Sequence, residues 1–144
     1  MSAAALYTPQ VLAAAVDLAA YPLDPGAPFQ GHASARACGS TLDLSITLDD
    51  AGTIQRIGAR ARSCAIGQAA AVLFVRGAAG HTGATIAAAR DAMVRWLADA
   101  EAPLPDWPGL SLIERARAYP ARHGAILLPW NAALDALASV AVPG

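Results

Sequence analysis

The 144 residues fit a single domain, 1–144, which is long enough to bury a core without metal or disulfide cross-links. Hydrophobic residues make up 56% and charged residues 15% of the chain, and this balance excludes an intrinsically disordered protein. The net charge of −1 gives no electrostatic basis for binding nucleic acid or an anionic membrane. All ten basic residues are arginines, so a Walker A loop and lysine Schiff-base chemistry are excluded.

The N-terminal segment predicts a helix rather than a targeting signal. Thr8 is a helix-capping residue, Pro9 suits the first helical position, and an apolar run follows to about Ala20. The first basic residue is Arg36, so the positive region of a signal peptide is missing, and no apolar run approaches the ~20 residues of a membrane span. Two cysteines without an export signal indicate a reducing compartment, and we expect a cytoplasmic protein without a membrane anchor.

The centre of the chain predicts a three-stranded antiparallel sheet. Residues 42–48 alternate between apolar and polar side chains, as in a strand with one buried face. The turn at 49–52 then returns the chain as a second strand over Thr53–Arg62, and Pro28–Arg36 is expected to form an earlier strand.

The remainder of the chain predicts helices. The expected segments are 65–75, a long helix capped by Thr82 or Thr85, 110–118, and a last helix from Tyr119-Pro120 to about Ser139. Pro129 should either kink the last helix or mark its true start. The three tryptophans are expected to anchor this helical layer. The predicted fold class is therefore α+β, with helices packed on one face of the sheet and the N-terminal helix alongside.

The only two cysteines are the residues best suited to carry chemistry. Cys38 precedes the first strand of the hairpin and Cys64 follows the second, so both thiols are expected at one end of the sheet. Cys64 would also lie at a helix N-terminus, where the helix dipole favours a thiolate. Such thiolates bind soft metals or transfer sulfur. Two structural roles are alternatives for the same cysteines. They could pack as small apolar side chains, or form a disulfide that stabilises the fold by about 3 kcal/mol.

Two segments resemble the U-type iron–sulfur cluster scaffold family, which includes the IscU, SufU and N-terminal NifU proteins. Residues 37–71, ACGSTLDLSITLDDAGTIQRIGARARSCAIGQAAA, are similar to the family's Cys-Gly motif, hairpin, second Cys motif and Ala-rich helix. Residues 119–134, YPARHGAILLPWNAAL, look like the SufU-type segment around the third family cysteine. The resemblance extends over about residues 5–138 and implies a SufU/IscU-like α+β fold.

The resemblance also implies a ligand set, and the chain departs from it at half of the positions. The family holds metal with three cysteines and an aspartate. Cys38 and Cys64 match the first two cysteines, whereas Ser40 replaces the aspartate and Ala125 the third cysteine. His123 is the candidate replacement ligand, although two residues of helix separate it from Ala125 by about 200°.

The other candidates for ligation are weaker. Asp43 has the opposite strand parity to Cys38 and should point to the other face of the sheet. His32 and His81 are less suited than His123, because they fall on the earliest strand and at a turn. Arg122 aligns with a family arginine and is expected to support the site or to pair with a carboxylate.

By resemblance, the chain would be a scaffold and not an enzyme. It would receive sulfur from a cysteine desulfurase, hold an iron–sulfur cluster or iron (or zinc in its place), and pass the cluster to acceptor proteins. Two thiolates cannot close a four-ligand site, so a cluster would need a homodimer, an external thiol or His123. Two alternatives stay open: a non-catalytic adaptor or regulator of an assembly partner, and a redox dithiol.

Overall fold

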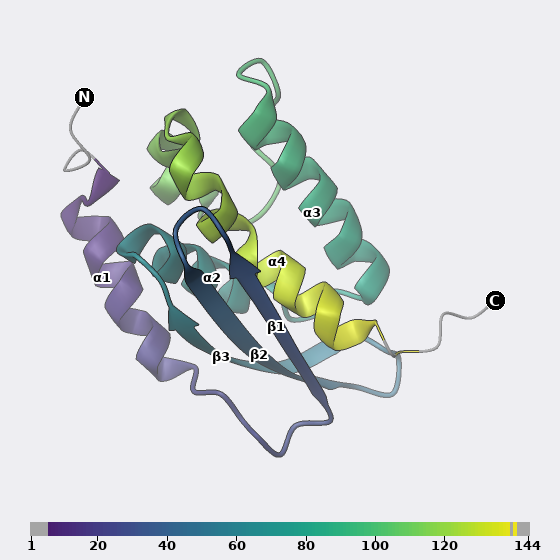
Figure 1. Cartoon of the computed structure of the whole chain (residues 1–144). Helices are drawn as coiled ribbons and strands as arrows, with labels where there is room; N and C mark the ends of the chain where they lie inside the picture. The colour runs from purple at the N-terminus through teal and green to yellow at the C-terminus, as the bar shows by residue number, and fades with distance from the viewer. Residues whose placement is uncertain (1–5, 139, 141–144) are drawn as a thin grey trace.

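A computed structural model describes residues 6–138 and 140 of the chain. Three strands form an antiparallel sheet in the order β1-β2-β3: β1 is Phe29–Ala35, β2 is Ser40–Leu48 and β3 is Ile54–Arg62 (Figure 1). Each strand lies within two residues of its predicted bounds. The connections are short hairpins, so the β1–β2 turn and the end of β3 lie at the same end of the sheet.

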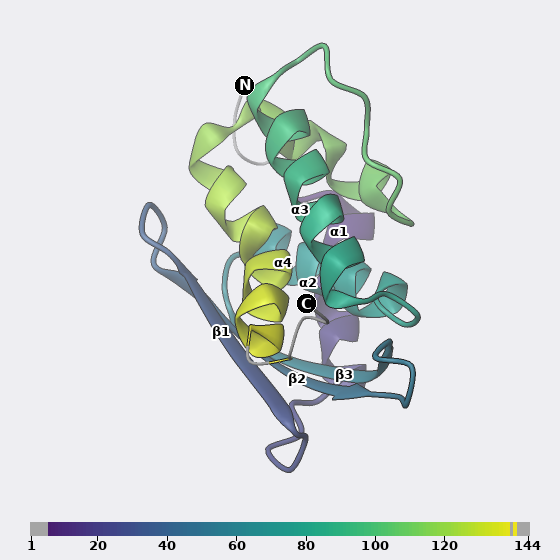
Figure 2. The same ribbon diagram turned by 90° about the vertical axis from the view of Figure 1, so that its right-hand side faces the viewer.

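Helices cover one face of this sheet (Figure 2). They are α1 (Pro9–Asp17), η2 (Leu18–Ala20), α2 (Ala65–Gly77), α3 (Gly83–Ala98), η3 (Leu110–Ala118), η4 (Pro120–Arg122) and α4 (His123–Leu137), where η denotes a 3₁₀-helix. Helix α4 packs on β1 and β2, α2 packs beside it, α1 lies against α2, and α3 covers α4 from outside. The predicted α+β architecture is confirmed.

The helix starts follow from local capping. The Thr8 hydroxyl accepts a hydrogen bond from the Val11 amide at the start of α1. Thr82, rather than Thr85, caps α3, and the Thr85 hydroxyl in turn accepts from the Thr82 amide, which completes a capping box. These bonds satisfy amide groups that the first helical turn leaves without partners.

The structure refines two details of the C-terminal half. The predicted short helix over 110–118 has 3₁₀ geometry, and Pro129 lies inside α4, so it does not mark the start of that helix. Helix α4 already begins at His123, because the 3₁₀ turn of Pro120–Arg122 leads directly into it. The expected end near Ser139 lies outside the described residues.

The core lies between the sheet and the helices. The inward residues Leu42, Leu44 and Ile46 of β2 are at most 1% exposed. Trp107 stacks on Phe74 of α2, and its ring nitrogen donates to the Leu73 carbonyl oxygen at 2.9 Å. All three tryptophans are buried, so their predicted role as anchors of the helical layer is confirmed. Within the described part of the chain, no helix combines the length and the hydropathy that crossing a bilayer requires.

Candidate cysteine site

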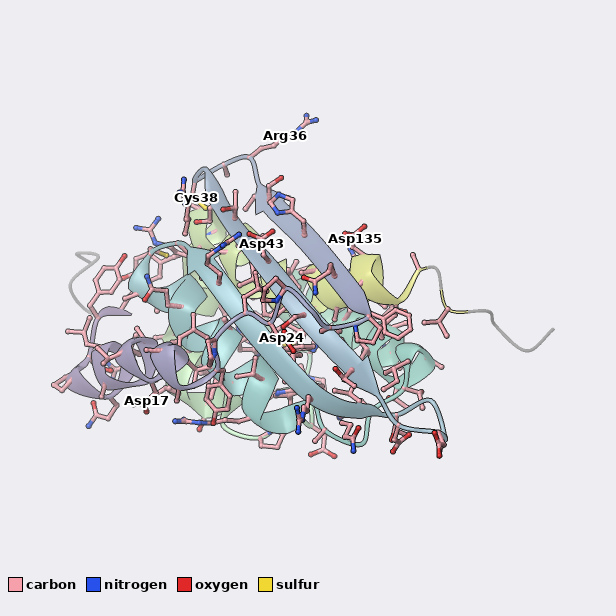
Figure 3. The ribbon with its side chains drawn as sticks, turned by 90° about the horizontal axis from the view of Figure 1, so that it is seen from below. Asp17, Asp24, Arg36, Cys38, Asp43 and Asp135 are labelled. Carbon is pink, nitrogen blue, oxygen red and sulfur yellow. The ribbon has the colours of Figure 1, made fainter. Side chains whose placement is uncertain are left out.

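Cys38 lies in the β1–β2 turn, at the end of the sheet (Figure 3). The turn closes through a hydrogen bond from the Gly39 amide to the Ala35 carbonyl, and Gly39 adopts φ 68°, a conformation that favours glycine. The Cys38 side chain is exposed, and its thiol donates to the Ser40 hydroxyl oxygen at 3.0 Å. Its sulfur is therefore accessible to a ligand from solvent.

Cys64 lies where β3 passes into α2. It is the N-cap residue of that helix, with extended backbone dihedral angles (φ −64°, ψ 169°), and its carbonyl accepts the first helical bond from the Gln68 amide. The sulfur makes no capping bond in the described structure. Cys64 is half-buried and its thiol is free. The positive end of the α2 dipole thus faces a thiol that the helix itself does not use.

Two serine hydroxyls join the cysteines. Ser63 donates to Ser40 Oγ at 3.1 Å and lies 4.0 Å from Cys64 Sγ, while Ser40 accepts from Cys38. The contacts therefore run from Cys38 through Ser40 and Ser63 to Cys64, and both sulfurs lie at the same end of the sheet. Ser63 has no place in the ligand pattern implied by the resemblance, and its position directly before Cys64 was the only sequence signal of this role.

Ala125, the position that the resemblance aligns with the family's third cysteine, lies near this group. A Cβ added to Gly67, on the first turn of α2, would overlap the Ser63 hydroxyl and would sit 3.3 Å from Ala125 Cβ. A Cβ on Gly124, the residue directly before Ala125 in α4, would lie 3.0 Å from Ala35 Cβ, at the end of β1. Cys38, Ser40 and Cys64 are thus linked through Ser63, while Ala125 is fully buried and lies near Gly67 in the first turn of α2.

Arg122 adds a positive charge to the site. Its Nη2 donates to the Tyr7 hydroxyl at 3.3 Å, and this hydrogen bond is the main cause of its raised pKa. Cys64 and Cys38 contribute to the raised pKa of Arg122 as well, by less than Tyr7 does. The Nε atom is buried and has no hydrogen-bond partner among the described residues.

His123 is not brought together with the two thiols. Its Nε2 lies 2.6 Å from the Arg117 carbonyl oxygen, and because a carbonyl only accepts, this nitrogen must carry the donated proton. As the first residue of α4, His123 is about 200° round the helix from Ala125. No group of three or more His, Cys, Asp or Glu side chains in the described residues is placed to hold a metal ion.

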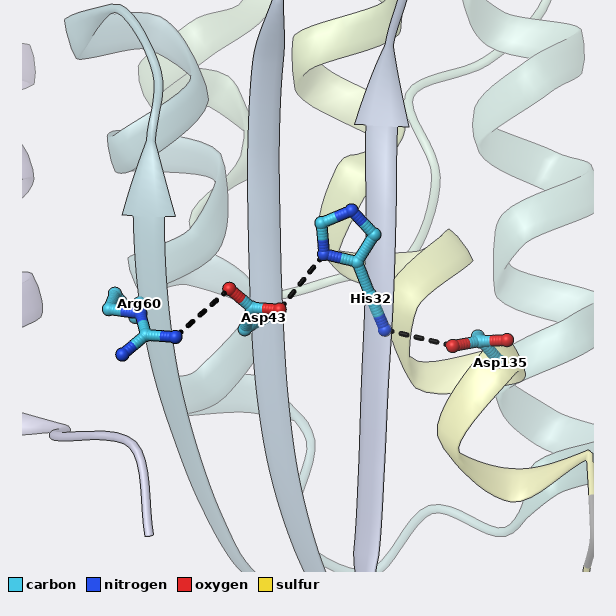
Figure 4. A network of polar contacts seen from close by, with 4 residues as sticks. All are labelled: His32, Asp43, Arg60 and Asp135. Atoms are coloured by element: carbon cyan, nitrogen blue, oxygen red, sulfur yellow. Dashed lines mark hydrogen bonds and ion pairs between the residues drawn. The ribbon is translucent and has the colours of Figure 1, made fainter. Parts of the chain in front are cut away.

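The remaining candidates are engaged elsewhere. Asp43 lies on the outer face of the sheet, where Oδ1 is 2.9 Å from His32 Nδ1 and Oδ2 is 3.5 Å from Arg60 Nη2 (Figure 4). Asp135 of α4 accepts the His32 backbone amide at 2.9 Å. His81 stacks on Trp107. The parity argument for Asp43 is therefore correct, and its carboxylate is not available to Cys38.

Proteins similar to this chain were found among solved structures. Neither protein-family models nor curated protein sequences gave a match. The crystal structure of a nitrogen-fixing NifU-like protein (N-terminal part) from Brucella abortus superposes with a TM-score of 0.80 and 27% identity, over 92% of both chains. The resemblance to the U-type scaffold family is confirmed.

Two further solved structures share the fold of this chain. A putative iron–sulfur cluster assembly scaffold protein for the SUF system, from Fervidobacterium islandicum AW-1, has a TM-score of 0.73 at 18% identity, over 94% of this chain and 99% of that one. A hypothetical protein has a TM-score of 0.68 at 18% identity, over 89% of this chain and 96% of that one. At these identities the likeness shows the fold, and the chemistry has to be argued from the residues.

Proposed function

We propose that this chain is a U-type scaffold-like protein that holds iron or a transient iron–sulfur cluster as its cargo on the thiolates of Cys38 and Cys64. The observation that supports this most is the convergence of two free thiols, far apart in sequence, through Ser40 and Ser63 at one open edge. The likeness to the Brucella protein over nearly the whole chain supports the same function. In this role the protein binds and releases a cluster and has no substrate to convert.

The residues present fit half of a cluster site. Thiolates are the usual ligands of iron–sulfur clusters, and zinc binds the same groups. The chain supplies two sulfurs, while Ser40 and Ala125 leave the rest of the coordination shell open. Because Cys38 is exposed, outside ligands can approach the iron from solvent. Weak, incomplete coordination suits a protein that must release its cargo.

The family resemblance also suggests partners. A cysteine desulfurase would supply sulfur as a persulfide, one of the two thiols would accept it, and an acceptor protein would receive the completed cluster. Because the thiols have to stay reduced for this chemistry, we place the protein in the cytoplasm.

The proposal is tested by loading the protein without oxygen. Wild-type chain supplied with ferric iron, sulfide and mercaptoethanol should develop sulfur-to-iron charge-transfer absorption. Cys38→Ser and Cys64→Ser should each reduce the loading by at least about tenfold. Changes in groups that merely support a ligand already weaken metal binding by about 10–100-fold, and loss of a ligand itself should cost no less. His123→Ala is the matched control and should load like wild type, since its ring is bonded to the Arg117 carbonyl.

Two outcomes contradict the proposal. Wild-type protein that stays colourless and free of iron would instead favour an adaptor that keeps the fold alone. If mild oxidation of the metal-free protein rapidly joined Cys38 and Cys64 in a disulfide, with loss of the two thiol hydrogens, a redox dithiol would be favoured.

A further inference from the structure

A large cavity lies in the helical layer, and neither cysteine lines it. Its volume is about 940 Å³, and it is open to solvent between the end of α3, the 3₁₀-helix η3, the start of α4 and Leu6. The end of α3 and the start of α4 lie at the same end of the helical layer (Figure 1). Ligand pockets in proteins have volumes of about 300–1,000 Å³, so this cavity has the size of a small-molecule site.

Much of the cavity lining is apolar. Leu97 and Ala98 end α3, Leu6 precedes α1, and Ala118 and Pro120 lie where η3 passes into η4. Leu6 and Leu97 are at most 7% exposed, so packing fixes their side chains, while Ala98 and Ala118 are exposed. The side chains of these residues carry no hydrogen-bonding groups. This part of the cavity therefore suits the aliphatic body of a ligand.

Two arginines of η3, Arg115 and Arg117, also line the cavity. Within the described part of the chain, no carboxylate forms an ion pair with either guanidinium, although Glu114 lines the same cavity. The Arg117 Cζ atom lies 5.7 Å from the centre of the Trp96 ring, which is buried in α3. This cation–π contact holds the positive charge in place and does not neutralise it. Both guanidinium groups are therefore available to an anion in the cavity.

We infer that this cavity binds a carboxylate with an aliphatic chain, with the carboxylate paired with Arg115 and Arg117 and the chain against the apolar lining. A guanidinium presents parallel donors that match the two oxygens of a carboxylate. The two arginines and Glu114 leave one positive charge to neutralise, so a singly charged head group fits better than a phosphate dianion. The inference goes beyond the proposed function and does not depend on it.

The test compares ligands that share a chain or a head group. Octanoate, octanol and octylamine have the same chain with an anionic, a neutral and a cationic head, and acetate has the carboxylate alone. Amide chemical shifts of ¹⁵N-labelled protein give both the dissociation constant and the place of binding. We expect octanoate to bind about fivefold more tightly than octanol, the factor given by one partly exposed ion pair, and octylamine to bind least of the three. Acetate should bind at least about tenfold more weakly than octanoate, because burial of two methylene groups already accounts for that factor.

Variants separate the role of charge from that of space. Arg115→Gln and Arg117→Gln should each weaken octanoate binding by about fivefold and leave octanol binding unchanged, whereas Arg56→Gln, on β3 and outside this cavity, should change neither. Ala118→Trp introduces a large side chain into the cavity from an exposed position and should weaken the binding of both ligands by at least about tenfold. Ala13→Trp, at an exposed position of α1, is its matched control. Thermal unfolding of each variant checks that the fold is retained.

The place of binding and the order of affinities decide the inference. Shifts centred on residues 97–100 and 111–123, with octanoate bound most tightly, would support it. Equal affinities for octanoate and octanol, or wild-type affinity in both glutamine variants, would overturn it. Shifts centred on the exposed α1 side chains of Leu12 and Val16 would indicate unspecific apolar binding and would also overturn it, as would the absence of shifts at millimolar octanoate. Each of these results leaves iron loading at the cysteines as a separate question.

Discussion

Restoring the two altered positions, with Ser40→Asp and Ala125→Cys in one chain, is expected to raise the affinity for Zn²⁺ by about 100-fold or more. Zinc prefers four tetrahedral ligands, and the variant would add a carboxylate and a thiolate to the two thiolates already present. Ser40 Oγ lies 3.0 Å from Cys38 Sγ, and Ala125 lies beside the first turn of α2, next to Ser63. Competition with a chromophoric chelator measures the change.

A matched control separates the effect of position from that of added ligands. Ser34→Asp with Ala13→Cys adds the same two groups at exposed sites, on β1 and on α1, and should bind zinc like wild type. The metal-free forms are compared by thermal unfolding, because Ala125 is fully buried and a larger side chain there crowds the core. If the restored chain bound zinc no more tightly than the control, the four positions would not lie close enough together to share one ion.

Gly31→Ala is expected to destabilise the fold by about 3 kcal/mol, the upper end of the usual range for overpacking. A Cβ at this position on β1 would overlap the Ala132 carbonyl oxygen of α4 and would lie 2.8 Å from Ala136 Cβ. Because α4 rests directly on β1, the clash must push the helix off the sheet. The free energy of unfolding in urea measures the cost. A loosened α4 would also move Ala125 away from the first turn of α2.

The comparison for this prediction is Gly83→Ala, at the first residue of α3. A Cβ there would be 3.9 Å from Leu137 Cδ1, at ordinary contact distance, and alanine favours the helix. We expect a change within about 0.5 kcal/mol, or a small gain in stability. Similar unfolding free energies for the two variants would mean that α4 does not pack closely on β1.

Local patterns were sufficient to predict most of the fold. The alternation of β2 specifies its buried face, and the threonine and proline at positions 8 and 9 specify the start of α1, because these signals act within one strand or one helical turn. The 3₁₀ character of 110–118 was not predictable in the same way. Its buried residues, Leu110, Ile113 and Ala116, recur every three positions, a spacing that one face of an α-helix also allows, and the segment packs against α2.

The site was predictable only in part. The hairpin places Cys38 and Cys64 at one end of the sheet by connectivity alone, and this geometry needs no knowledge of side chains. The hydrogen bond between Arg122 and Tyr7 joins residues 115 positions apart, and no local pattern anticipates it. The position of the His123 side chain depends on where α4 begins. The sequence left this start undecided, because Pro129 is compatible with a kink inside the helix or with a later start.

The account depends most on one claim, that Cys38 and Cys64 form a single thiolate site. Titration of the reduced protein with Cd²⁺, followed by sulfur-to-cadmium absorption, tests this directly because cadmium is a soft metal that selects thiolates. We predict a plateau at no more than one Cd²⁺ per chain, with Cys38→Ser and Cys64→Ser each weakening binding by at least about tenfold. A plateau at two Cd²⁺ per chain, with each single variant keeping one site of unchanged affinity, would contradict the claim.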